Sequence, residues 1–183
     1  MKNLTKAMMI MLALVLLTAC GAKEEEEEVV EEKKTEAVMG EVLETMFFEY
    51  QVNDAYTTSV ISEMTPKEDK EFLVVDITVK NPSEEKDVVM ADTDFKAVYG
   101  AERCDPLSTY GTDPLLTDEL PSSYTLAAGE SKTGKLLFVI GLGDRDFVLQ
   151  TQDHYTSSDR EEEGVIDGDV YSYAFTAEAR EPE

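Results

Sequence analysis

The stretch between residues 71 and 83 restricts the fold of this chain more than any other. Every second residue from Leu73 to Val79 is a branched apolar one, and three of the four residues between and after them, up to Lys80, are polar. This period of two predicts a β-strand that turns one face to a core. Asn81-Pro82-Ser83 follows with residues typical of a turn, so the strand is expected to end there.

The same signal recurs along the rest of the chain. Phe48 to Val52 alternates in the same way, and Gly and Pro residues separate the other candidate strands, at residues 88–90, 94–99, 135–140, 147–150 and 170–176. No stretch after Gly40 keeps a helical period, so at most one short helical turn is expected. Many short strands with such separators predict an all-β fold, an antiparallel β-sandwich.

Residues 1–19 have the features of an export signal. Lys2 and Lys6 are followed by the uncharged run Ala7–Leu17, which as a helix would be only about 16 Å long, too short to span a bilayer. Leu17-Thr18-Ala19-Cys20 resembles the lipobox of bacterial lipoproteins. The resemblance implies cleavage before Cys20 and a diacylglycerol thioether on its sulfur. An ordinary secretory signal that happens to contain a cysteine is the alternative.

Residues 20–39 form a separate block of composition. It contains the run Glu24–Glu28 and no aromatic residue, so it cannot bury enough apolar surface to offset the entropy of ordering. We expect the lipidated cysteine to be followed by a disordered acidic tether that reaches about 25 Å as a flexible coil. The folded domain is then expected to comprise residues 40–183.

The charge of the chain excludes some partners. It has 40 acidic and 16 basic residues, for a formal net charge of −24 at pH 7, and most of this charge belongs to residues 40–183. Such a surface repels the phosphates of nucleic acids and the headgroups of anionic lipids. We therefore expect no nucleic acid partner, and we expect the membrane to be contacted through the lipid anchor.

Three ordered motifs carry a resemblance to a known family. They are the segment Glu71–Ser83 with the preceding Phe48–Val52, the segment Asp94–Gly100, and Leu126–Ser131 followed by Gly134–Val139. Together they resemble a family of immunoglobulin-like domains that occurs on lipoproteins and secreted proteins of Gram-positive bacteria, related in fold to a mycobacterial secreted antigen. Ala128, where the family often has proline, and the acidic insert Asp159–Glu163 depart from the pattern. The resemblance implies a β-sandwich on the outer face of the cell membrane and supplies no catalytic residue.

Catalytic residues are not predicted by the sequence itself either. Cys104 is the only thiol left once Cys20 is lipidated, and no second cysteine or histidine lies near it in sequence. His154 is the only histidine, and the chain has no Gly-x-Ser-x-Gly nucleophile motif. We expect a protein that is not an enzyme.

Calcium is the best chemical alternative. Three Asp-x-Asp pairs fall in or near predicted loops, and carboxylate oxygens are the ligands that Ca²⁺ prefers. No EF-hand loop is present, and alternating aspartates are also typical of a solvent-facing strand edge. The candidate ligands are Asp92, Asp94, Asp144, Asp146, Asp167 and Asp169.

Two functions from different classes remain open. The first is a surface module that meets a protein or envelope partner, and the second is a lipoprotein that binds a small ligand or calcium. A solid core with an exposed apolar patch favours the first, whereas a deep apolar pocket favours the second. An aromatic binding groove is a further possibility, but most tyrosines are expected to pack in the core and on the sheet faces; they are Tyr50, Tyr99, Tyr110, Tyr124, Tyr155, Tyr171 and Tyr173.

Overall fold

A computed structural model of the protein describes residues 34–108, 113–156 and 165–181, and the side chains of residues 155, 156, 165 and 166 lie outside the description. The predictions for residues 1–33, for Tyr110 and for the insert Asp159–Glu163 therefore fall outside the described residues. The described elements, in chain order, are β1 (Glu36–Val38), β2 (Leu43–Glu44), β3 (Glu49–Thr58), β4 (Lys70–Lys80), β5 (Val88–Ala91), the 3₁₀ turn η1 (Asp92–Asp94), β6 (Lys96–Tyr99), β7 (Glu102–Cys104), β8 (Ser123–Leu126), β9 (Ser131–Gly141), β10 (Asp146–Thr156), β11 (Val165–Thr176) and β12 (Glu178–Ala179).

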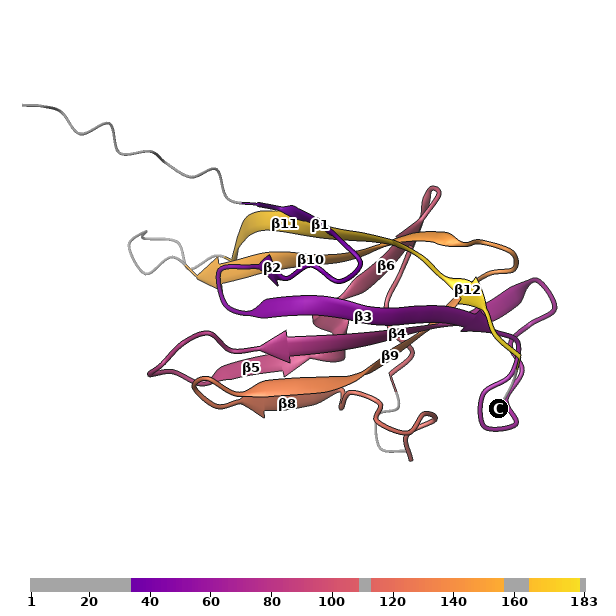
Figure 1. The fold of residues 1–183 in the computed structure, drawn as a ribbon, viewed down its shortest axis with the longest axis horizontal. Coiled ribbons are helices and arrows are strands. Elements are labelled where there is room, and N and C mark those ends of the chain that lie inside the picture. The colour runs from indigo at the N-terminus through magenta and orange to yellow at the C-terminus, as the bar shows by residue number, and fades with distance from the viewer. Residues whose placement is uncertain (1–33, 109–112, 157–164, 182–183) are drawn as a thin grey trace, which may run out of the picture. The chain divides into compact units, whose positions relative to one another are not determined.

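Two main sheets form a β-sandwich, which confirms the predicted fold class (Figure 1). Sheet A has the strand order β1-β11-β10-β6-β7. Sheet B has the order β12-β3-β4-β9, and β2 also pairs with β3. The strands β5 and β8 form a two-stranded ladder that pairs with neither sheet. The single 3₁₀ turn is the only helical element among the described residues.

Both end segments cross from one sheet to the other. β1 pairs in parallel with β11 in sheet A, and the chain then continues into β2, which pairs with β3 in sheet B. At the other end, β11 lies in sheet A, and β12 pairs in parallel with β3. The edge of β3 is thus covered at one end by β2 and at the other by β12, which leaves less open backbone for unwanted pairing.

These end strands differ from the sequence expectations in two ways. The predicted antiparallel sandwich contains two short parallel pairings, and the folded part begins at β1 and not at Gly40. Ala37 at the centre of β1 is buried, with 4% of its surface exposed. This segment is held in place by backbone pairing with β11. A strand of three residues is too short to show an alternating pattern in the sequence.

The main core lies between the sheets. Its centre is a group of aromatic rings in which Tyr50 meets Phe95 at 5.4 Å and Tyr173 at 5.8 Å between ring centroids. The inward residues of β4 and β9 are also fully buried, among them Val75, Ile77 and Phe138. Burying side chains of this size contributes about 1.5–3 kcal/mol each before the entropic cost of ordering.

A second apolar cluster covers the outer face of sheet B. Phe72, Val74 and Leu137 point away from the main core and are nevertheless buried, because Ile61 and residues 107, 115 and 116 pack over them. Residues 115–120, which we call the covering segment, are held to the edge of β9 by backbone hydrogen bonds. One of these runs from the Leu120 amide to the Lys135 carbonyl at 2.9 Å. Sheet B is therefore packed on both faces over part of its length.

Gly134 makes this close approach possible. A Cβ atom at this position would lie 2.7 Å from Leu120 Cδ2 and 2.9 Å from the Asp118 carbonyl oxygen. Real Cβ contacts are longer than this, so a side chain would push the covering segment away from β9.

Asn81 connects three segments at the end of β4. Its side-chain amide donates to the carbonyl oxygens of Lys86 at 2.7 Å, Leu126 at 3.1 Å and Ala127 at 3.1 Å. Its Oδ1 accepts from the Ser83 amide at 3.0 Å. The residue is completely buried, so these bonds replace water for four backbone groups.

Candidate functional site

The outer face of sheet B carries a groove of about 520 Å³. We call it the sheet-B groove. It lies beside the apolar cluster that covers this sheet, and its lining combines charged side chains with Tyr56 and apolar residues. The lining residues that the argument uses are Asp54, Tyr56, Asp76, Leu115, Lys135 and Arg180.

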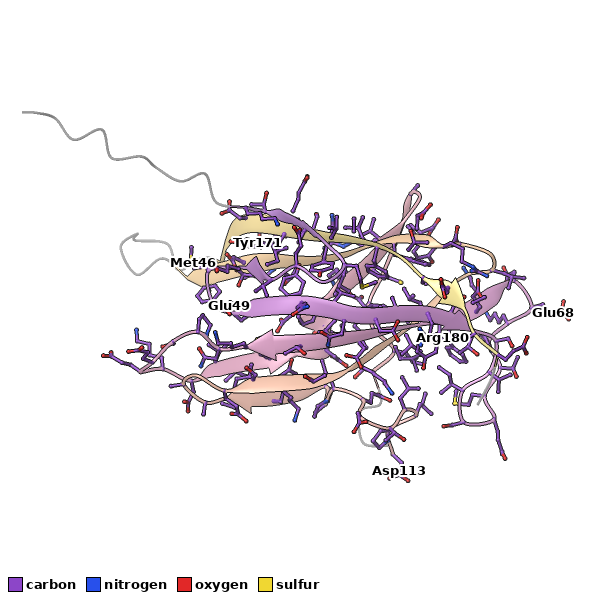
Figure 2. The ribbon with its side chains drawn as sticks, in the orientation of Figure 1. Met46, Glu49, Glu68, Asp113, Tyr171 and Arg180 are labelled. Atoms are coloured by element: carbon purple, nitrogen blue, oxygen red, sulfur yellow. The ribbon has the colours of Figure 1, made fainter. Side chains whose placement is uncertain are left out.

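Arg180 closes one side of the sheet-B groove. Its guanidinium donates to both carboxylate oxygens of Asp54 at 2.8 Å and lies over the ring of Tyr56, 4.4 Å from the centroid. Figure 2 shows Arg180 on the C-terminal segment beside β3. The hydrogen bonds from Arg180 hold the pKa of Asp54 below its usual range, although partial burial opposes this. The arrangement fixes the C-terminal segment against sheet B.

Four charged side chains form a row across the floor of the sheet-B groove. Asp54 lies directly opposite Asp76 on β4, and Asp76 lies opposite Lys135 on β9. Like charges in direct cross-strand contact destabilise a sheet, and Arg180 and Lys135 on either side offset this repulsion. The groove floor therefore carries a row of four charged groups, with two adjacent carboxylates in the middle and a basic group at each end.

A second hollow, of about 690 Å³, lies beside β10 on the outer face of sheet A. We call it the β10 hollow. One wall is formed by Thr93 and Asp94 of η1, and the other by Gln152 and His154 of β10. The remaining lining residues are Lys96, Arg103, Cys104, Asp105 and Asp167.

The β10 hollow brings together the thiol and the imidazole that the sequence singled out. Burial, together with Asp105 and Glu102, raises the pKa of Cys104 to about 11, so its thiol stays protonated near neutral pH. His154 Nδ1 lies 3.1 Å from Asp167 Oδ1 on the exposed sheet face. A protonated thiol that packs partly against the core is a poor nucleophile.

The six candidate calcium ligands do not meet at one place. Asp94 and Asp167 both line the β10 hollow, whereas Asp144 lies in the turn between β9 and β10 and Asp146 begins β10. Asp169 is exposed on β11. In the part of the chain that the structure describes, no three carboxylate, histidine or cysteine side chains are grouped so that they could hold a metal ion.

Some of these aspartates have structural partners. Asp94 Oδ2 accepts a hydrogen bond from the Ala91 amide at 2.7 Å, which closes the 3₁₀ turn. Asp146 Oδ1 accepts one from the Thr176 hydroxyl at 2.8 Å. These acids therefore have local roles that the sequence pattern did not distinguish from metal binding.

Asp92 is buried at the start of η1, with 5% of its surface exposed, and its Oδ1 has no hydrogen-bond partner among the described residues. Burial raises its pKa, and the nearby carboxylates of Asp94 and Glu119 add to this. The folded state therefore binds this proton more tightly than the unfolded chain, whose ordinary value is 3.8.

We expect Asp92→Asn to be at least as stable as the wild type at pH 7. The contribution of Asp92 to stability is present below pH 3.8 and is lost as the pH rises through the raised pKa. The variant lacks this loss, so its advantage grows between pH 3 and pH 7. Urea unfolding across this range measures the difference, and a variant that is clearly less stable at pH 7 would contradict the expectation.

Most of the described tyrosines lie in the core, as predicted. Tyr50, Tyr99, Tyr171 and Tyr173 are all buried. Tyr124 is half-buried, and the side chain of Tyr155 lies outside the description. Sequence reasoning did not single out Tyr56, which lines the sheet-B groove under Arg180. No local pattern reveals this pair, because the two residues are far apart in sequence.

The fold and the two hollows define an all-β sandwich domain with open, polar-lined recesses. Residues 38–162 match the family described as a domain of unknown function, DUF4352, and the chain belongs to this family. The matched range contains all three of the ordered motifs. A search among curated proteins finds no match to the chain.

Two solved structures resemble the fold. The yjhA protein from Bacillus subtilis is 17% identical, with a TM-score of 0.45, and the alignment covers 73% of this chain and 99% of that one. An uncharacterized β-sandwich protein from Clostridium difficile is 15% identical, with a TM-score of 0.44, and the alignment covers 79% of this chain and 96% of that one. Within the described residues, no helix has the length and apolar character needed to cross a membrane.

Proposed function

We propose that the protein is an extracytoplasmic lipoprotein, anchored through Cys20 on the outer face of the cell membrane, whose sandwich is a non-enzymatic binding module. The observation that carries this proposal is the apolar run Ala7–Leu17, which ends directly in the four lipobox residues before Gly21. Two acyl chains hold a soluble domain at a bilayer stably, at about 0.8 kcal/mol for each buried CH₂ group.

The exposed side chains support a binding role. Val38, Met39, Val42, Met46 and Phe47 belong to one short segment around β1 and β2, and all are exposed to more than a third. The sheet-B groove and the β10 hollow, in contrast, are open and lined largely by polar groups. An apolar surface with a solid core favours a protein or envelope partner over a small apolar ligand.

The chemistry of the recesses supports the absence of an enzymatic role. The sheet-B groove is lined by carboxylates, hydroxyls, a lysine and an arginine, without histidine or cysteine. In the β10 hollow, the thiol of Cys104 stays protonated near neutral pH. Thiolate catalysis needs a cysteine with a lowered pKa, whereas burial raises the pKa of Cys104.

Cys20→Ala tests the anchor. The variant is expected to move from the membrane fraction to the soluble fraction, or to stay unprocessed with its signal peptide, because only a thiol accepts the lipid. Cell fractionation with mass spectrometry of the N-terminus measures both results, and Cys104→Ala is the matched control, which should stay at the membrane. A Cys20→Ala protein that is membrane-bound and correctly trimmed would refute the anchor.

A further inference from the structure

β10 is much longer than its neighbour β6 in sheet A. β10 extends from Asp146 to Thr156, whereas β6 contains only four residues, and the two strands pair only at Val148, Leu149 and Gln150. On the other side, β11 pairs with β10 along nearly its whole length. Among the described strands, none pairs with residues 151–156 of β10 on the β6 side.

The reason for this gap lies just before β6. The chain forms η1 at Asp92–Asp94 and enters the sheet only at Lys96, so the residues that would have extended β6 turn away towards β5. The β10 hollow occupies the space that results, between η1 and the unpaired part of β10. An open strand edge presents rows of amide and carbonyl groups that accept a further strand.

The charges around the β10 hollow indicate what such a strand would carry. Lys96 is ion-paired with Asp105, and His154 meets Asp167. Arg103 also lines the hollow and is exposed, and its guanidinium has no hydrogen bond or ion pair with another described residue. Arg145 and Arg180, the other arginines with described side chains, each pair with a carboxylate. The guanidinium of Arg103 lacks such a partner among the described residues, and its fork of donors matches a carboxylate.

We propose that the β10 hollow binds an extended peptide segment of a partner protein, which adds a strand to residues 151–154 of β10 and places an acidic side chain against Arg103. Main-chain hydrogen bonds along β10 provide the affinity, and Arg103 provides the selectivity. The hollow, at about 690 Å³, lies within the volume range of sites that hold small ligands.

A second copy of this chain is a poorer occupant of the same edge. Each copy carries a net charge of −24, so two copies that pair edge to edge repel each other. A partner segment with fewer charges avoids most of this repulsion. The inference rests on the proposed binding role but not on the lipid anchor, so a negative result with Cys20→Ala would leave it intact.

The test uses the full chain, purified in detergent, and a phage-displayed library of random heptapeptides as the probe. Enriched peptides are expected to alternate β-branched residues with others and to share an Asp or Glu at one position. The strongest peptide is then synthesised with a fluorophore, and its affinity is measured by anisotropy. Arg103→Ala is expected to weaken binding at least tenfold, and Lys67→Ala, which removes a charge from an exposed loop, should leave the affinity unchanged.

Two further measurements locate the bound peptide. Thr93→Trp, which places a large side chain in the β10 hollow, should abolish binding, and Thr93→Ser should not. Hydrogen exchange should show new protection, when the peptide binds, of those amides in residues 151–154 that do not already bond to β11. If Thr93→Trp does not fold, the affinity of Arg103→Ala and the hydrogen-exchange data still test whether the peptide binds in the β10 hollow.

Three results would overturn the proposal. The first is that the library enriches no peptide. The second is that enriched peptides bind Arg103→Ala and Lys67→Ala equally well. The third is that the amides of residues 151–154 on the edge away from β11 are already protected in the free chain and become exposed on dilution, which would identify a second copy as the occupant.

Discussion

Replacing Asn81 by alanine is expected to lower the free energy of unfolding by about 3 kcal/mol. The substitution removes a hydrogen bond from the carbonyl oxygens of Lys86, Leu126 and Ala127 and from the amide of Ser83. The Ala127 carbonyl keeps its bond from the Glu130 amide. Each buried polar group left unsatisfied costs about 1–3 kcal/mol, and water can reach those at the surface. Because the side chain joins the end of β4 to two other segments, its loss should also loosen the β5-β8 ladder.

Asn53→Ala is the matched control for this prediction. Asn53 also donates two side-chain hydrogen bonds, to Asp76 at 2.7 Å and to Thr78 at 3.0 Å, but it is exposed. Water replaces these bonds, so the cost should be below about 1 kcal/mol. Urea unfolding measures both variants, and equal losses at the two sites would show that burial of the Asn81 bonds has no special effect.

Gly134→Ala is expected to cost about 2–3 kcal/mol, near the upper end of the usual range for overpacking. The added methyl group would lie 2.7 Å and 2.8 Å from two carbons of Leu120 and 2.9 Å from the backbone oxygen of Asp118. The leucine side chain can rotate, but the carbonyl belongs to the segment that bonds to the edge of β9. The covering segment must therefore move.

A double-mutant cycle identifies the cause of this loss. Leu120→Ala alone should cost about 2–5 kcal/mol, because Leu120 is buried. In the Gly134→Ala background, the same change removes part of the clash and should cost less, which gives a coupling energy between the two sites. Purely additive losses would show that Gly134 does not act through Leu120. Thr133→Ala, at an exposed neighbour in β9, should have little effect.

The strands that bury one face in the main core could be predicted from the sequence. The alternation in residues 73–80 corresponds to β4, and that in Phe48–Val52 corresponds to the first half of β3. The pattern fails where sheet B is covered on both faces. Phe72 and Val74 are apolar on the face expected to be polar, because residues 107, 115 and 116 pack over them.

The shortest strands could not be predicted, for a physical reason. β1, β2 and β12 contain two or three residues each, and their conformation is set by the strand that they pair with. The same holds for the recesses. Arg180 meets Asp54 and Tyr56 only because β12 crosses to sheet B, and Arg103 lines the β10 hollow only because η1 turns away from β10.

The parallel pairing of β1 with β11 also determines how the domain would respond to mechanical load. A pull on the N-terminal segment acts along β1, and so it acts across the backbone hydrogen bonds that join residues 36–38 to residues 172–174. Bonds loaded in this shear direction share the force and break together, whereas an antiparallel hairpin pulled at its open end loses its bonds one at a time. The three-residue strand β1 would then resist unfolding of the sandwich under a force applied at its N-terminal side.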